Sequence, residues 1–265
     1  MTRRRFYAAP VDTEGAVATL SADETHHLMH VLRMTPGDEA FVFDGCGKEY
    51  RCSFRSVKDG RARLEIVDAL SDEVESPLQL TLAQALAKGE KFDFIIQKAT
   101  ELGVSRIAPL VTRYADLKLD EQQTTKRVDR WRRISLEALK QCGRRKLVEI
   151  MPPGTLREFL SANEPSRANN SPGISRQTQR ALLLFSERGG LAVTDTLAEI
   201  SESCEVVALV GPEGGWSDDE LELLKECGSK AVTLGPRVLR TETAALVAIT
   251  LIQHAIGDLS VRGNR

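Results

Sequence analysis

From residue 78 onward the chain alternates short apolar runs with segments of helical pattern. The apolar runs predict strands at 78–87, 107–111, 147–150, 182–185, 206–210 and 231–234, and helical patterns lie at 91–102, 125–142, 217–228 and 244–256. Strands that alternate with helices predict an α/β fold, in which a mostly parallel sheet is covered by helices on both faces. Ligands bind such sheets at the carboxyl ends of the strands, so we expect function in the loops after Phe185, Val210 and Leu234.

The first part of the chain has a different pattern. Ser21 and Glu24 have the spacing of a capping box, which predicts the start of one helix. Three strands follow in the prediction, at 40–43, 50–54 and 62–67, with Asp-Gly turns between them. Residues 68–77 are acidic and end in proline, which indicates a domain boundary. We therefore predict a small β-barrel domain at 1–72 and the α/β domain at 73–265.

Composition limits the classes of protein that the chain can belong to. The formal net charge is only −2, so any nucleic-acid contact must use locally concentrated positive charge. The most apolar run, 244–256, is too short to span a bilayer, and no apolar leader follows the charged residues 2–7. The five cysteines form no CxxC pair, which argues against a zinc cluster. These features predict a soluble, cytoplasmic protein with reduced thiols and without metal. Residues 163–179 are predicted to form a mobile insertion.

The loop after the predicted strand at 206–210 reads Gly-Pro-Glu-Gly-Gly over residues 211–215. Glycines around the one carboxylate of Glu213 let a ligand approach the main chain closely, because no Cβ intervenes. The loop has neither the Walker A ending nor the GxGxxG pattern. A tight turn between strand and helix is the structural alternative.

The loop at 234–244 places Arg237, Arg240 and Glu242 at the start of a helix that is otherwise nearly all apolar. A helix that is apolar all round is buried by its own sheet, and a second subunit can complete that burial. Charges at the start of such a helix are costly to desolvate unless they are paired. An ion pair of Arg240 with Glu242 or Glu213 is one interpretation, and it is compatible with a functional role.

These two loops resemble the cofactor loops of SPOUT-class methyltransferases. The wider pattern is similar to the RsmE family, the 16S rRNA (uracil-N3) methyltransferases, and the likeness covers almost the whole chain. Further motifs match in the family's order: Arg-Arg-Phe-Tyr at 4–7, His-His-Leu-Met-His-Val-Leu-Arg at 26–33, Phe-Asp-Gly at 43–45, Ile-Gln-Lys-Ala-Thr-Glu-Leu-Gly-Val at 96–104, and Gln-Cys-Gly-Arg at 141–144.

The resemblance implies an N-terminal PUA-like, RNA-binding β-barrel and a C-terminal domain threaded into a trefoil knot. It also implies a homodimer that binds S-adenosyl-L-methionine and methylates N3 of a uridine in 16S rRNA, either as naked RNA or in the assembled small subunit. The cofactor contacts carried over by motif are Leu184, Phe185, Gly211, Pro212, Glu213, Gly214, Gly215, Leu234, Gly235, Val238, Leu239 and Arg240.

Catalysis at uridine N3 needs a proton acceptor and a group that stabilises the developing anion. We hypothesise that Arg240 stabilises the uracil anion or orients the nucleotide. Either Glu242 or Glu213 would then accept the proton.

RNA contacts are predicted where basic and aromatic residues gather, since such groups contact phosphates and stack on splayed bases. The predicted set is Arg4, Arg5, Phe6, Arg33, Arg130, Arg133, Arg144 and Arg145. A merely solvated charged face is the alternative for the segment 126–146. His26, His27 and His30 lack the HExxH form, so packing or RNA contact is favoured over metal binding.

Two other functions are compatible with these sequence features. The chain can be a non-catalytic RNA-binding or ribosome-assembly factor, although the glycine-rich loop and the pair Arg240 and Glu242 speak against this. Alternatively, the enzyme can act on a ribose 2′-hydroxyl or on tRNA.

Overall fold

The computed structural model describes residues 3–71, 74–115, 121–162, 180–187, 189–201 and 204–259. The predicted insertion at 163–179 lies outside these residues. The chain forms two compact units. The smaller unit comprises residues 1–75 together with 135–147, and the larger unit comprises 76–134 and 148–265. The chain therefore leaves the smaller unit after Glu75 and returns to it at Ser135.

The smaller unit is built on a five-stranded sheet in the order β1-β3-β4-β5-β2. Its strands are β1 (Arg5–Tyr7), β2 (Val17–Thr19), β3 (Glu39–Phe43), β4 (Glu49–Lys58) and β5 (Arg61–Leu70). The three predicted strands are β3, β4 and β5, whereas the sequence analysis missed β1 and β2. Both are only three residues long, so their apolar pattern is too short to recognise.

A short helical segment lies beside this sheet. It consists of α1 (Ala22–His26), which continues into a π-helical turn, η2 (His27–Val31). A separate 3₁₀ turn, η1 (Pro10–Thr13), precedes β2. Ser21 accepts a hydrogen bond from the Glu24 amide, as the predicted capping box requires. The carboxylate of Glu24 instead forms an ion pair with Lys140 at 2.5 Å. Only half of this capping box is therefore present.

The larger unit contains a sheet of eight strands, all of them parallel. The path runs β11-β13-β10-β12-β6-β7-β8, and β9 also pairs with β7. The strands are β6 (Leu80–Ala85), β7 (Arg106–Val111), β8 (Glu149–Ile150), β9 (Gly154–Thr155), β10 (Arg180–Phe185), β11 (Leu191–Ala192), β12 (Glu205–Val210) and β13 (Lys230–Thr233). The predicted α/β class with a parallel sheet is confirmed.

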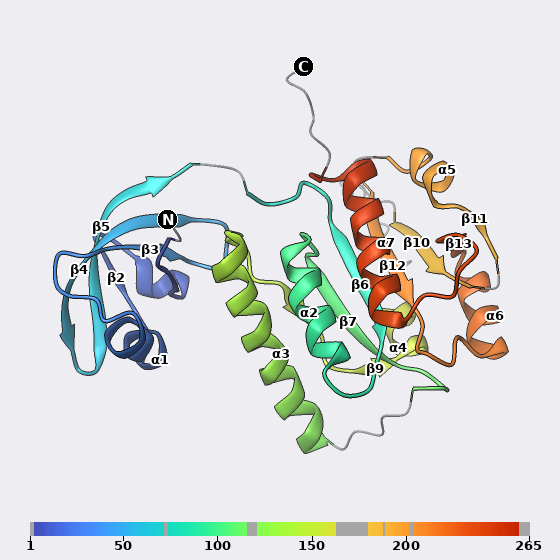
Figure 1. The fold of residues 1–265 in the computed structure, drawn as a ribbon, viewed down its shortest axis with the longest axis horizontal. Coiled ribbons are helices and arrows are strands. Elements are labelled where there is room, and N and C mark those ends of the chain that lie inside the picture. The colour runs from blue at the N-terminus through green and yellow to red at the C-terminus, as the bar shows by residue number, and fades with distance from the viewer. Residues whose placement is uncertain are drawn as a thin grey trace, which may run out of the picture. The chain divides into compact units, whose positions relative to one another are not determined.

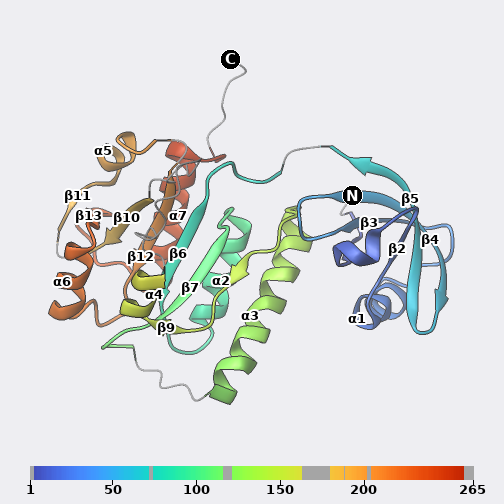
Figure 2. The same ribbon diagram turned by 180° about the vertical axis from the view of Figure 1, so that it is seen from behind.

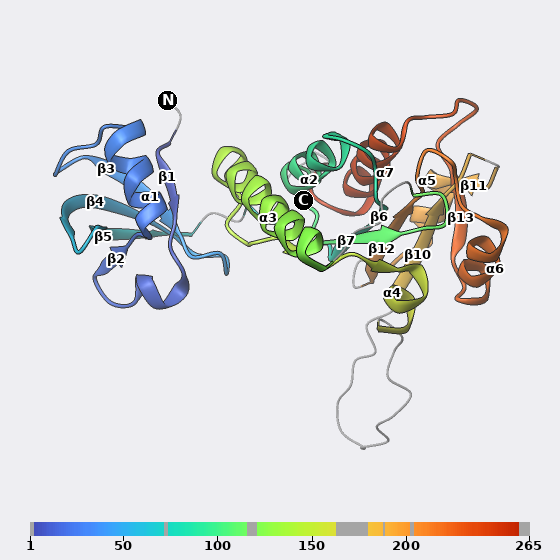
Figure 3. The ribbon, with the colours of Figure 1, turned by 90° about the horizontal axis from the view of Figure 1, so that it is seen from below.

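Helices cover both faces of this sheet, as Figure 1, Figure 2 and Figure 3 show. One apolar core lies between the sheet and α2, α5, α7 and the first part of α3, and a second core lies between the sheet and α4 and α6. The helices are α2 (Lys91–Glu101), α3 (Glu121–Cys142), α4 (Leu156–Ala162), α5 (Val193–Ala198), α6 (Asp218–Glu226) and α7 (Thr241–Ile256). Along β12 the side chains of Val206, Ala208 and Val210 enter the first core, while those of Val207 and Leu209 enter the second. This alternation follows from the two-residue period of a strand.

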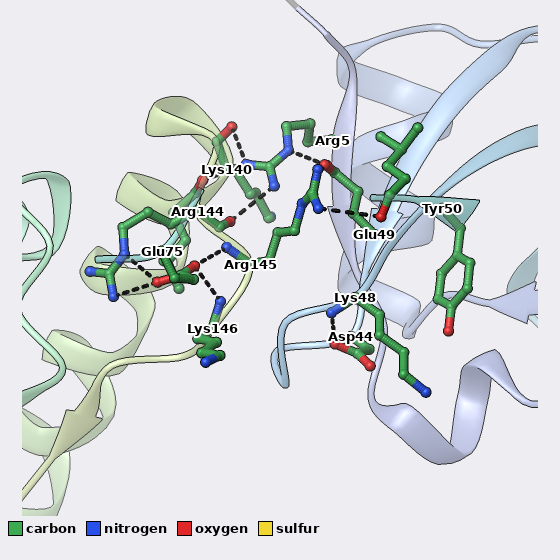
Figure 4. A network of polar contacts seen from close by, with 12 residues as sticks. Arg5, Asp44, Lys48, Glu49, Tyr50, Glu75, Lys140, Arg144, Arg145 and Lys146 are labelled. Atoms are coloured by element: carbon green, nitrogen blue, oxygen red, sulfur yellow. Dashed lines mark hydrogen bonds and ion pairs between the residues drawn. The ribbon is translucent and has the colours of Figure 1, made fainter. Parts of the chain in front are cut away.

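A buried ionic network attaches residues 135–147 to the sheet of the smaller unit (Figure 4). The carboxylate of Glu49 accepts from Arg5 at 2.6 Å and from Arg145 at 3.1 Å, and all three side chains are at most 5% exposed. Arg5 also donates to the main-chain oxygens of Leu139 and Arg144. The one carboxylate is thus the counter-charge of two buried guanidinium groups, and the carbonyl oxygens accept further hydrogen bonds from Arg5.

Glu75 provides a second attachment within the same unit. Its carboxylate forms an ion pair with Arg144 at 2.9 Å and accepts from the amides of Arg145 and Lys146. The same segment also joins the loop after β3, where the amide of Leu147 donates to the carbonyl of Gly45. These contacts fix the returning segment to the sheet at several points.

We predict that Glu49→Gln destabilises the protein by about 3 kcal/mol, because it leaves two buried guanidinium groups without a counter-charge. Urea unfolding of the full-length protein measures this loss. Glu65→Gln is the matched control, since Glu65 pairs with Arg55 on the exposed surface of the same sheet, and it should cost less than about 1 kcal/mol. Equal losses in the two variants would contradict a special role for the buried centre.

Candidate active site

The loops that follow β10, β12 and β13 lie at one edge of the sheet, because parallel strands present their carboxyl ends on the same side. Strands β13, β10 and β12 are direct neighbours, with Phe185 aligned with both Val232 and Val210. These loops enclose a cavity of about 270 Å³ together with the start of α7. It is lined by Phe185, Ser186, Glu187, Val210, Gly211, Pro212, Glu213, Trp216, Leu234, Gly235, Arg237, Val238, Leu239, Arg240, Thr241 and Ala244.

A chain of hydrogen bonds holds the start of α7 against the end of β12. The hydroxyl of Thr241 donates to the carbonyl of Gly211 at 2.7 Å, and the side-chain amide of Gln84 donates to the Thr241 oxygen at 2.9 Å. Gln84 is fully buried within β6, and Thr241 is 4% exposed. Because buried polar groups require partners, this relay fixes the distance between two walls of the cavity.

The glycine-rich loop packs closely on Trp216. A Cβ at Gly211 would lie 2.9 Å from the indole Nε1 of Trp216, closer than normal contact allows. Trp216 lines the cavity, and its buried indole N–H has no hydrogen-bond partner among the described residues. The helix after this loop begins with the predicted capping box, in which Ser217 and Glu220 exchange hydrogen bonds. That prediction is confirmed.

Glu213 is held by a lysine that the sequence analysis did not consider. Nζ of Lys91, at the first position of α2, lies 2.6 Å from Oε1 of Glu213. The hydrogen bond from Lys91 lowers the pKa of the Glu213 carboxyl, and the same hydrogen bond raises the pKa of the Lys91 ammonium. The expected ion pair between Arg240 and Glu213 is thus replaced by one with Lys91.

Arg240 and Glu242 lie at the start of α7, as the sequence predicted. Arg240 is the N-cap residue, is exposed, and lines the cavity. Glu242 lies in the first turn, where a carboxylate is favoured by the helix dipole. Its Oε2 atom is buried and has no hydrogen-bond partner among the described residues. Glu242 raises and Arg240 lowers the pKa of the Lys91 ammonium, and of these groups Arg240 and Glu213 line the cavity.

Known proteins are similar to this chain in sequence and in fold. The model of the RNA methyltransferase domain matches residues 74–253, and that of the RNA methyltransferase PUA domain matches residues 20–67. Two proteins named ribosomal RNA small subunit methyltransferase E are similar. The Synechocystis protein is 33% identical over 94% of this chain and 76% of its own, and the Bacillus subtilis protein is 30% identical over 91% of both chains. The chain belongs to the ribosomal RNA small subunit methyltransferase E family.

A solved structure of this family has a bound ligand. The ribosomal RNA small subunit methyltransferase E from Neisseria gonorrhoeae, bound to S-adenosyl methionine, is 33% identical and has a TM-score of 0.83. The alignment covers 97% of this chain and all of that chain. The predicted PUA domain is likewise confirmed by the family model over residues 20–67.

In the structure, most of the cofactor contacts that were inferred from the family motifs lie at the cavity. Those that line it are Phe185, Gly211, Pro212, Glu213, Leu234, Gly235, Val238, Leu239 and Arg240. Leu184, Gly214 and Gly215 are not among the lining residues. Leu184 belongs to the core on the opposite face of the sheet, because neighbouring strand residues point in opposite directions.

Seven lining residues were not among the predicted cofactor contacts: Ser186, Glu187, Val210, Trp216, Arg237, Thr241 and Ala244. They directly adjoin the predicted loops, so wider loop bounds would have included them. Lys91 and Gln84 are different, because they lie on α2 and β6, respectively, far away in sequence. A charged residue in the first turn of a helix and a glutamine within an apolar strand are weak sequence signals of a functional site. Their roles become visible only in the folded structure.

The predicted RNA contacts divide into two groups. Arg4, Arg33, Arg130 and Arg133 are exposed. Phe6 is fully buried, and Arg5, Arg144 and Arg145 are at most 8% exposed. The three arginines are committed to the ionic network of the smaller unit, so we assign them a structural role there.

Two further features bear on metal and membrane binding. The rings of His26 and His30 lie 4.6 Å apart, but no group of three or more potential metal ligands is found among the described residues. Within the same described ranges, no helix is long and apolar enough to cross a bilayer.

We predict that Lys91→Met raises the pKa of Glu213 toward the ordinary glutamate value, because the variant removes the hydrogen bond that favours the carboxylate. Since the pKa is lowered in the folded state, the ion pair stabilises the protein above the ordinary glutamate pKa, and this stability is lost on acidification through the lowered value. Carboxyl ¹³C NMR titration measures the shift.

Lys98→Met is the control for this titration. Lys98 forms an ion pair with Glu101 on the same helix, so its loss should leave Glu213 unchanged. If Glu213 titrates alike in the wild type and in Lys91→Met, the ion pair does not set its pKa.

Proposed function

We propose that this chain is an S-adenosylmethionine-dependent methyltransferase that methylates N3 of a uridine in 16S rRNA of the small ribosomal subunit. The observation that carries the proposal is the cavity at the carboxyl edge of the parallel sheet. It is built from the same three loops whose motifs match the family, and a family member that is 33% identical binds S-adenosyl methionine. The name of the relatives supports ribosomal RNA of the small subunit as the substrate.

The residues of the cavity fit this cofactor. Phe185, Val210, Leu234 and Ala244 provide an apolar wall for an adenine ring, and the carboxylates of Glu187 and Glu213 suit a ligand with cationic groups. The buried Trp216 N–H supplies a donor that has no partner among the described residues. Gly235 allows a close approach of a ligand to the main chain, because nothing lies within 4 Å of the position that its Cβ would take. When bound, the cofactor supplies an electrophilic methyl group on a sulfonium.

The catalytic roles follow from the charges around the cavity. The exposed guanidinium of Arg240 stabilises the negative charge that develops on the uracil as N3 loses its proton. Glu213 is a weak base, because Lys91 already compensates its charge and lowers its pKa. Glu242 retains a buried carboxylate oxygen without a partner among the described residues. We therefore assign proton acceptance to Glu242 and the holding of the cofactor loop to Glu213.

The two units have different binding roles in this proposal. The smaller unit, with the exposed Arg4 and Arg33, contacts the phosphate backbone of the RNA, and the larger unit binds the cofactor. Arg130 and Arg133 add exposed positive charge on α3. The enzyme is a homodimer in this proposal, since the apolar α7 retains partly exposed residues that a second subunit can cover. It acts in the cytoplasm, and the trefoil knot that the resemblance implies stays a prediction.

We predict that Gly211→Ala weakens binding of S-adenosylmethionine at least tenfold, because the added Cβ collides with Trp216 and displaces a wall of the cavity. Isothermal titration calorimetry measures the affinity. Gly154→Ala is the control, since its added Cβ meets only a side-chain oxygen of Glu158 at 3.4 Å, outside the cavity lining. An unchanged affinity in Gly211→Ala would place the cofactor elsewhere.

The function itself is tested by mass spectrometry of 16S rRNA nucleosides from cells that lack the gene. We expect the loss of one 3-methyluridine, its return with the wild-type gene, and no return with Arg240→Ala. Lys225→Ala, on the exposed last turn of α6, should restore the modification fully. Loss of a 2′-O-methyl group instead would assign a different target, and an unchanged nucleoside profile would refute the proposal.

A further inference from the structure

Tyr114 lies beside the glycine-rich loop 211–215 and belongs to none of the motifs that match the family. It belongs to the loop that follows β7 at the carboxyl edge of the sheet. A Cβ at Gly214 would lie 2.9 Å from Cβ of Tyr114 and 3.5 Å from its Cγ, so the tyrosine leans directly on this glycine. Gly214 follows Glu213, which lines the cavity. Tyr114 therefore contacts the loop that forms one side of the cavity, one residue away from the lining residue Glu213.

The position of this loop is fixed by hydrogen bonds. The amide of Arg113 donates to Oε1 of Glu220 at 2.9 Å, and Glu220 also receives the Ser217 amide in the capping box of α6. Ala115 closes the turn with a hydrogen bond to the carbonyl of Thr112. Tyr114 is thus anchored to the helix that begins at the cavity loop itself.

The exposure of Tyr114 distinguishes it from most aromatic residues of the larger unit. Its exposed fraction is 49%, while Phe92, Trp131, Phe159, Phe185 and Trp216 are buried. Among the described residues of this unit, Phe94 is also exposed, at 43%, but it lies on α2. Single exposed apolar side chains are common on protein surfaces, so it is the contact of Tyr114 with the glycine-rich loop that distinguishes it.

The chemistry of the proposed substrate suggests that ligand. N3 lies on the Watson–Crick edge of uracil, so the base must be splayed out of its stack before the edge can enter the cavity. A splayed base is held by stacking on an aromatic side chain, and removal of such a stack costs roughly five- to hundredfold in affinity.

We propose that Tyr114 binds the substrate by stacking on a pyrimidine base, the target uracil or its neighbour, at the rim of the cavity. This inference rests on the proposed function. Gly214 contributes to the position of Tyr114, because a larger residue there would collide with Tyr114 and push it away from the loop. The stack uses the ring face, so it does not require the phenol hydroxyl.

The test uses the full-length enzyme, radiolabelled S-adenosylmethionine, and small subunits from cells that lack the gene. Tyr114→Ala should raise KM for the subunits about tenfold, with unchanged affinity for the cofactor, whereas Tyr114→Phe and Tyr114→Trp should retain wild-type KM. Phe94→Ala is the matched aromatic control and should leave this KM unchanged. An unchanged KM in Tyr114→Ala, or an equal rise in Phe94→Ala, would overturn the proposal.

A second measurement separates stacking from a structural role. In Tyr114→Trp, RNA should quench tryptophan fluorescence beyond the quenching of the wild type, whose Trp131 and Trp216 are buried. If Tyr114→Ala weakens cofactor binding as much as it raises KM, or if no extra quenching occurs, Tyr114 only supports the loop. If the wild-type enzyme methylates no subunits at all, the proposed function fails instead.

Discussion

The parallel sheet is the constraint on which the active site depends. Because all its strands run in one direction, their carboxyl ends share one edge, and loops that are far apart in sequence meet there. The two-residue period of β12 sends alternate side chains into separate cores, so both faces must be covered by helices. Its last residue, Val210, then opens into the cavity loop. The fold thus creates the site before any catalytic side chain is considered.

Much of this arrangement was predictable from sequence, for identifiable physical reasons. Strands buried on both faces are continuous apolar runs, and the capping box at Ser217 is a local pattern, so both were found correctly. The partner of Glu213 was not predictable, because Lys91 is more than a hundred positions away and meets it only through the fold. Arg5, Arg144 and Arg145 were assigned to RNA, since a sequence shows charge but not burial. These three buried arginines form ion pairs with Glu49 and Glu75 in the smaller unit.

The electrostatics of the site explain why two similar carboxylates are assigned different roles. Glu213 lies opposite a lysine and is held in its ionised form, whereas Glu242 begins a helix that is otherwise apolar. The environment of each group, rather than its chemical type, decides which one is suited to exchange a proton. The hydrogen bonds of Gln84 and Thr241 keep the start of α7 in register with the glycine-rich loop, so these charges are held on a rigid support.

The discontinuous smaller unit has a consequence for synthesis of the protein. Its first segment ends at Glu75, but Arg5 and Glu49 receive their remaining partners only from residues 139–145. A nascent chain that has emerged only as far as Glu75 holds an incomplete charge centre that stays in contact with water. The charge centre of the N-terminal sheet is therefore complete only after more than half of the polypeptide has been translated, including the 59 residues 76–134 of the other unit that separate its two parts.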